Sequence, residues 1–83
     1  MRTPPPERAL DATIRRLKIA SLKAQLEVCR LQEVAFAEQF ERSSTFDQKA
    51  AIAHDWDMVC TEVREMRLAL DFLEKQERES KPH

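Results

Sequence analysis

The sequence predicts an all-α fold in which two long helices form an antiparallel, coiled-coil-like hairpin. The 83 residues contain no glycine, and proline occurs only at positions 4–6 and 82. Apolar residues recur every three or four positions on both sides of one short polar break at 43–45, which is the pattern of amphipathic helices. Abundant alanine, leucine, glutamate and arginine are typical of long helices. We therefore expect helices over 7–42 and 46–78.

The chain is short enough for one small domain. Three consecutive prolines suit an extended N-terminal arm over 1–6, because proline is tolerated only in the first turn of a helix. The hairpin is expected over 7–79, with its turn near 43–45, and a frayed tail over 80–83. Ser44 and Thr45 both precede a polar residue by three positions, Asp47 and Gln48. Either can therefore cap the second helix.

Two apolar stripes run along the first helix. The first alternates steps of four and three residues, the heptad rule for lengthwise helix packing, and we expect it to pack on the second helix. Its members are Leu10, Ile14, Leu17, Ala24, Val28, Leu31 and Ala35, with Ser21 in the remaining slot. The second stripe lies about 140° around the helix and comprises Ile19, Leu22, Leu26, Cys29, Phe36 and Phe40.

The second helix has a single clear seam and a smaller apolar set on another face. The seam alternates steps of four and three, and Glu77 occupies the slot that follows it. The small set consists of Met58, Leu68 and Phe72. We expect the only tryptophan to be a core residue of the seam, whose members are Ile52, Trp56, Val59, Val63, Met66, Leu70 and Leu73.

One partner helix cannot cover both stripes of the first helix, and a long exposed apolar band marks an interaction surface. We therefore predict partner binding through the second stripe, extended by part of the small set on the second helix. A homodimer, with two hairpins paired into a four-helix bundle, would cover this surface. A helical protein partner is the alternative. The predicted partner-binding residues are Ile19, Leu22, Leu26, Cys29, Phe36, Phe40, Leu68 and Phe72.

Charge is distributed unevenly along the chain. Residues 1–31 carry seven basic and three acidic side chains, a net of +4, whereas residues 32–83 carry seven basic and twelve acidic ones, a net of −5. An antiparallel hairpin lays the basic start of the first helix beside the acidic end of the second. We expect this complementarity to set the helix orientation. The formal net charge of −1 argues against a general polyanion binder.

The sequence has no pattern typical of an enzyme. Cys29, Cys60, His54 and His83 lack the paired short spacings of a zinc site, and no glycine-rich loop is present to hold phosphate. The two cysteines are expected to be free and reduced. We therefore predict no catalytic residues, no cofactor, no metal and no small-molecule substrate.

Three function classes remain. The leading prediction is a non-enzymatic interaction protein, such as a small adaptor, co-chaperone or regulatory subunit, that binds a partner helix. A dimeric helical-bundle regulator that binds nucleic acid is the second, and a structural coiled-coil component of a larger assembly is the third. No apolar run approaches the length of a membrane span, and residues 1–6 lack the apolar stretch of a secretory signal. We therefore expect a cytoplasmic protein.

Overall fold

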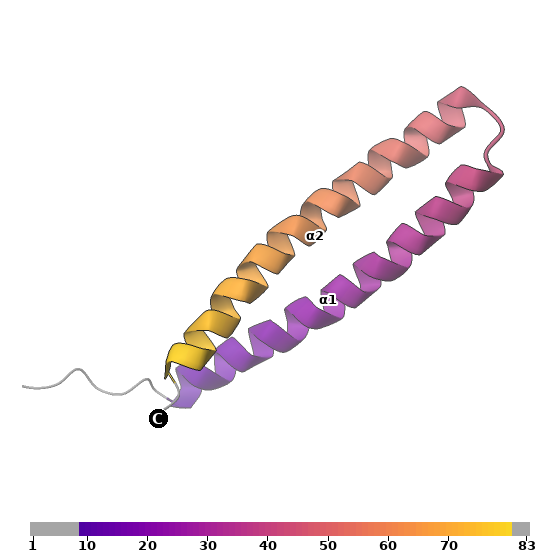
Figure 1. The fold of residues 1–83 in the computed structure, drawn as a ribbon. Helices are drawn as coiled ribbons and strands as arrows, with labels where there is room; N and C mark the ends of the chain where they lie inside the picture. Colours follow the sequence, from indigo (N-terminus) through magenta and orange to yellow (C-terminus); the bar gives the residue numbers. More distant parts are fainter. Residues whose placement is uncertain (1–8, 81–83) are drawn as a thin grey trace, which may run out of the picture.

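In the computed structural model, residues 9–80 are described, and they form two α-helices. Helix α1 spans Ala9–Arg42 and helix α2 spans Phe46–Ser80. The helices run antiparallel and side by side, as Figure 1 shows. The predicted all-helical hairpin is therefore confirmed. The end of α1 and the start of α2 agree with the sequence prediction, whereas α2 continues two residues further than expected. The predicted arm at 1–6 and the helix start near residue 7 lie outside the described residues.

The turn between the helices is closed by side chains and needs no glycine. Among residues 9–80, no residue has a positive φ angle. The Ser43 amide and hydroxyl both donate to the carbonyl oxygen of Gln39, at 3.0 and 2.7 Å. The Gln48 amide donates to Thr45 Oγ1 at 3.2 Å. Thr45 is therefore the N-cap of α2, as one of the two sequence alternatives proposed.

Lys49 fastens the first turn of α2 to the last turn of α1. Its Nζ donates a hydrogen bond of 2.7 Å to the Phe40 carbonyl oxygen and lies 4.3 Å from the centre of the Phe40 ring. The last carbonyl groups of a helix have no partner within the helix and carry partial negative charge. The Phe40 carbonyl also accepts a longer hydrogen bond of 3.3 Å from the Ser43 amide, and the lysine ammonium adds a short, charged donor and a cation–π contact. The turn is thus held from both helices.

The predicted seam of α2 faces α1. Leu70 is 9% exposed, and the other seam residues are half-buried. The heptad spacing also continues into Lys49 at one end and Glu77 at the other, both half-buried. Trp56 is half-buried in this seam, as expected for a core residue. Met58, Leu68 and Phe72 are 54–67% exposed, which confirms that they lie on a different face.

The predicted seam of α1 is wrong, because the other stripe packs against α2. Leu10, Leu17 and Leu31 are 57–67% exposed, whereas Cys29 is only 6% exposed. The buried seam keeps a strict alternation of four and three, but two of its positions are charged, which hid the repeat. Both charged residues have partners on α2, so the polar positions are compatible with packing. The inner seam of α1 is Arg15, Ile19, Leu22, Leu26, Cys29, Glu33, Phe36 and Phe40.

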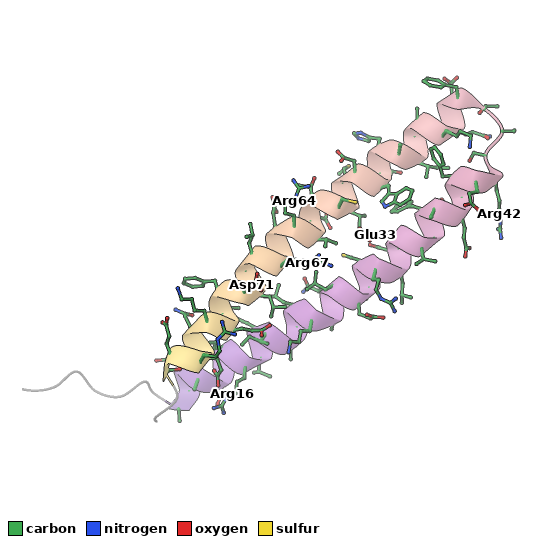
Figure 2. The ribbon with its side chains drawn as sticks, viewed as in Figure 1. Arg16, Glu33, Arg42, Arg64, Arg67 and Asp71 are labelled. Atoms are coloured by element: carbon green, nitrogen blue, oxygen red, sulfur yellow. The ribbon has the colours of Figure 1, made fainter. Side chains whose placement is uncertain are left out.

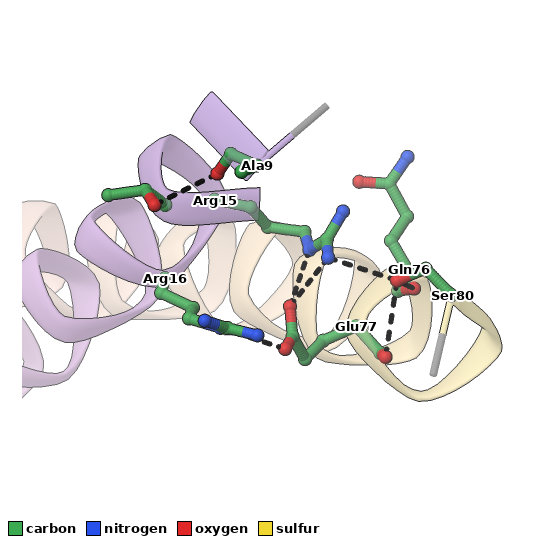
Figure 3. A network of polar contacts seen from close by, with 7 residues as sticks. Ala9, Arg15, Arg16, Gln76, Glu77 and Ser80 are labelled. Carbon is green, nitrogen blue, oxygen red and sulfur yellow. Dashed lines mark hydrogen bonds and ion pairs between the residues drawn. The ribbon is translucent and has the colours of Figure 1, made fainter. Parts of the chain in front are cut away.

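The open end of the hairpin is joined by a charged network (Figure 3). Arg15 donates to Glu77 through Nε and the terminal nitrogen, both at 2.7 Å, and reaches Ser80 Oγ at 3.0 Å. Arg16 Nε donates to the other Glu77 carboxylate oxygen at 3.1 Å. Because the Arg15 side chain is 9% exposed and the Glu77 side chain 16%, water screens this pair less than a surface pair. The predicted charge complementarity is therefore realised at the open end.

Candidate helix-binding surface

The structure divides the predicted partner-binding residues into two groups that do not share a surface. Six of them, on α1, belong to the inner seam: Cys29 is buried, and Ile19, Leu22, Leu26, Phe36 and Phe40 are half-buried. The other two, on α2, are exposed: Leu68 by 67% and Phe72 by 61%. Whether any of these eight residues contacts a partner stays a prediction. Because six of them pack against α2, the exposed apolar surface of α1 is formed by other residues.

The open surface is a face of α1 that α2 leaves uncovered. We call it the outer stripe, and its eight positions are all exposed. They span 25 helical steps, which is about 37 Å along the helix axis. Leu10 and Leu17 are 67% and 65% exposed, and Val28 is 55% exposed. The outer stripe consists of Leu10, Ile14, Leu17, Ser21, Ala24, Val28, Leu31 and Ala35.

The outer stripe has larger side chains on both sides of a small-residue middle. Leu10, Ile14 and Leu17 lie on one side, whereas Val28 and Leu31 lie on the other, where the stripe ends at the small Ala35. Ser21 and Ala24 lie between them, at the centre. Small residues let two helix backbones approach closely, and larger ones fill the space where crossing helices diverge. The stripe therefore has the shape of a site for a second helix that crosses near its middle.

Few charges border the outer stripe. On one side the flanking positions, seven residues apart, are Asp11, Lys18, Gln25 and Gln32. On the other side they are Thr13, Ala20, Glu27 and Val34. Val34 is 50% exposed and widens the apolar area. Glu27 is already paired with Arg30 of the same helix at 2.7 Å, and that arginine holds the Glu27 pKa below its ordinary value. A docked helix would therefore desolvate few unpaired charges.

A groove continues the outer stripe toward α2. It has a volume of about 400 Å³, and Ser21, Ala24 and Val28 of the stripe line one wall. Glu62 and Met66 of α2 line the other wall. Apolar concave surfaces of this kind receive anchoring side chains of a bound helix. The groove thus gives a partner access to both helices of the hairpin.

Two charged residues of the inner seam, Arg15 and Glu33, were not predicted from the sequence, and both form hydrogen bonds to α2. Arg15 has its acceptors on Glu77 and Ser80. Glu33 projects between the helices (Figure 2) and accepts a hydrogen bond from the Cys60 thiol at 3.4 Å. The signal that could have revealed them is heptad continuity, because Glu33 fills the only gap in the apolar repeat from 19 to 40 and Arg15 occupies the position that precedes this repeat.

The two cysteines occupy covered or partly covered positions on different helices. Both are free thiols: Cys29 is buried and Cys60 half-buried. Burial, followed by the hydrogen bond to Glu33, raises the pKa of the Cys60 thiol. Since the thiolate is the nucleophile and the metal ligand, this environment disfavours both kinds of chemistry at Cys60. Within residues 9–80, no group of three or more side chains suited to metal binding comes together.

Neither α1 nor α2, over the part of the chain that the structure describes, offers a stretch with the length and apolar character of a bilayer span. A search for similar proteins finds no matching family model, no similar curated protein and no similar solved structure. The features that bear on function are therefore those of the hairpin itself. Its distinguishing feature is a first helix with apolar residues on two faces, only one of which the hairpin covers.

Proposed function

We propose that this chain is a non-enzymatic helical interaction protein, in the manner of a small adaptor, co-chaperone or regulatory subunit. It binds a partner helix through the outer stripe of α1. The observation that carries the proposal is the exposure of this stripe: a 37 Å apolar band whose large members are 42–67% exposed. Contiguous apolar surface of this extent on a soluble protein marks an interaction site.

The helix-in-groove mode fits the pattern of this surface. Bound amphipathic helices are recognised through anchors spaced three and four residues apart, and the outer stripe alternates these two spacings. Its few bordering charges limit the cost of desolvation on binding. By contrast, a nucleic-acid role would need a cluster of free basic groups, and two of the four basic residues at the start of α1, Arg15 and Arg16, both bind Glu77. We therefore put forward no second function.

Site-specific photocrosslinking in the native cell tests the proposal. A photoreactive residue replaces Leu17 in one variant and Thr61, which is exposed on α2, in the control variant. We expect a discrete protein adduct from position 17 and none from position 61. Adding Leu31→Asp should abolish the adduct while circular dichroism remains unchanged, because the charge lies on the exposed face of α1.

The proposal would be overturned if position 17 gave no adduct. It would also fail if Leu31→Asp left the adduct yield unchanged, since the outer stripe would then not be the contact. Equal adducts from positions 17 and 61 would indicate unspecific collision rather than binding. Mass measurement of the adduct identifies whether the partner is the same chain or a different protein.

A further inference from the structure

We propose that the outer stripe of α1 binds the outer stripe of a second copy of this chain, antiparallel and about a two-fold axis near residues 22 and 23. This inference rests on the proposed function and names the partner. Two observations support it: the stripe complements itself in size about its midpoint, and the two ends of the hairpin carry opposite net charge.

The side chains of the stripe complement each other in size when two copies of it pack in antiparallel orientation. In a two-fold interface, residue i contacts residue j and residue j contacts residue i. With the axis at the midpoint of the stripe, the eight positions form four pairs, each occurring twice. Ser21 and Ala24 meet at the centre, two pairs of larger side chains lie outside them, the outermost pair joins a leucine to an alanine, and no position is left over. The pairs are Leu10 with Ala35, Ile14 with Leu31, Leu17 with Val28, and Ser21 with Ala24.

Other registers are less favourable. A shift by one heptad toward the turn places Ile14 opposite Glu38 and Leu10 opposite Arg42, so apolar side chains would face charges. The opposite shift leaves Leu31 and Ala35 without a partner in the stripe. Only the centred register covers the whole apolar band. The flanking side chains also tolerate it, because Lys18 then lies near Gln25 and Asp11 near Gln32.

Charge selects the antiparallel orientation over the parallel one. The open end of the hairpin, residues 9–25 and 67–80, carries seven basic and five acidic side chains, a net of +2. The turn end, residues 26–66, carries four basic and nine acidic side chains, a net of −5. A parallel pair would set two turn ends beside each other, both strongly negative. The antiparallel pair sets each negative turn end beside a positive open end, which is complementary.

The resulting assembly is a four-helix layer rather than a square bundle. On α1, the outer stripe lies about 140° around the axis from the inner seam. Helices at the corners of a four-helix bundle meet their two neighbours at about 90°. The order across the layer is therefore α2, α1, the partner's α1 and the partner's α2. The face of about 37 by 10 Å covers roughly 740 Å² in projection from both chains, which is below the ~1,200 Å² of a standard interface and typical of weak, transient ones. We therefore expect weak, reversible dimerisation with a dissociation constant on the order of 10–100 µM.

Disulfide trapping with two single-cysteine additions tests orientation and register together. Leu10→Cys and Ala35→Cys are prepared separately in the full chain and oxidised under mild conditions, alone and mixed. Both positions are exposed, so the hairpin fold is retained, as circular dichroism will verify. We expect a dimer linked between positions 10 and 35 in the mixture, with at least about tenfold less from either variant alone. The wild-type chain, whose own thiols are buried or half-buried, is the control.

Each other result has a defined meaning. Efficient links between two Leu10→Cys chains, or between two Ala35→Cys chains, would establish a parallel pair and overturn the inference. A wild-type chain that sediments as a monomer up to about 1 mM would overturn it as well. If that monomer still gave an adduct with a different protein at position 17, the proposed function would survive with a foreign helix as partner. If no adduct formed either, both proposals would fall.

Discussion

A Leu→Ala substitution should lower the free energy of unfolding strongly in the inner seam of α1 and only slightly in the outer stripe. Leu26 lies in the inner seam and is half-buried, whereas Leu31 lies in the outer stripe and is 57% exposed. Replacing either with alanine removes the same atoms and the same intrinsic helix propensity, so the pair is matched. Any difference in the free energy of unfolding therefore reports tertiary packing on α2.

The magnitudes follow from burial. A Leu→Ala change at a buried site costs 2–5 kcal/mol, and a half-buried site lies near the lower limit, so Leu26→Ala should cost about 2 kcal/mol. Full burial of a leucine contributes about 1.5–3 kcal/mol, and less than half of Leu31 is covered. Leu31→Ala should therefore cost under about 1 kcal/mol. With about 4–8 °C per kcal/mol for a chain of this size, Tm should fall by roughly 8–16 °C for Leu26→Ala and by less than about 8 °C for Leu31→Ala.

Thermal unfolding followed by circular dichroism at about 1 µM chain measures both values below the expected range of self-association. A repeat at about 100 µM should raise the wild-type Tm and should enlarge the effect of Leu31→Ala, because the outer stripe then contacts a partner. If both variants lost the same Tm at the low concentration, the assignment of Leu26 to the inner seam and Leu31 to the open face would be refuted.

Further predictions concern the turn and the open end. Thr45→Ala should destabilise the hairpin by about 1 kcal/mol through loss of the N-cap, whereas the neighbouring Ser44→Ala should change stability by less than about 0.5 kcal/mol, both measured by urea unfolding. Lys49→Met should cost about 1 kcal/mol, because the Phe40 carbonyl loses a charged donor; an unchanged urea midpoint would contradict this role. The guanidinium groups that bind Glu77 lower the pKa of its carboxyl, so its contribution is present above the ordinary pKa of about 4.3 and is lost as pH falls through the lowered value. Glu77→Gln should lower Tm at pH 7 and make Tm less sensitive to acid; an acid profile parallel to the wild type would argue against the pairing.

The sequence was sufficient for the fold because the helical signals are continuous. With no glycine and no internal proline, only the polar segment at 43–45 could break the helix, and the structure ends α1 at Arg42 and begins α2 at Phe46. The seam of α2 was also predictable, since all seven predicted positions are apolar and fall into one repeat. In both cases the sequence contains one pattern and no alternative to it.

The inner seam of α1 could not be identified by apolarity, because two heptad repeats compete on the same helix. The exposed repeat contains no charged residue, whereas the buried one contains Arg15 and Glu33. The side chains of α2 decide between the two repeats. Glu77 lies at the height of Arg15 and accepts its hydrogen bond, and Cys60 lies at the height of Glu33 and donates to it. A charged residue inside a heptad therefore has to be judged together with the residue at the same height on the other helix.

Charge acts at short range within the hairpin and at longer range in the proposed dimer. Within the hairpin, Arg15 and Glu77 meet at 2.7 Å in a largely covered site, where dissolved ions have little access. In the proposed dimer, the net charges of the two ends act across solvent-exposed surfaces, where the Debye length falls from about 10 Å at 0.1 M salt to 3 Å at 1 M. Added salt should therefore weaken the antiparallel dimer well before it affects the hairpin. Sedimentation at about 0.05 M and 0.5 M NaCl, beside Tm of the dilute chain, separates the two. If the dissociation constant of the dimer did not change with salt concentration, its orientation would be determined by side-chain size alone and the charge argument would be wrong.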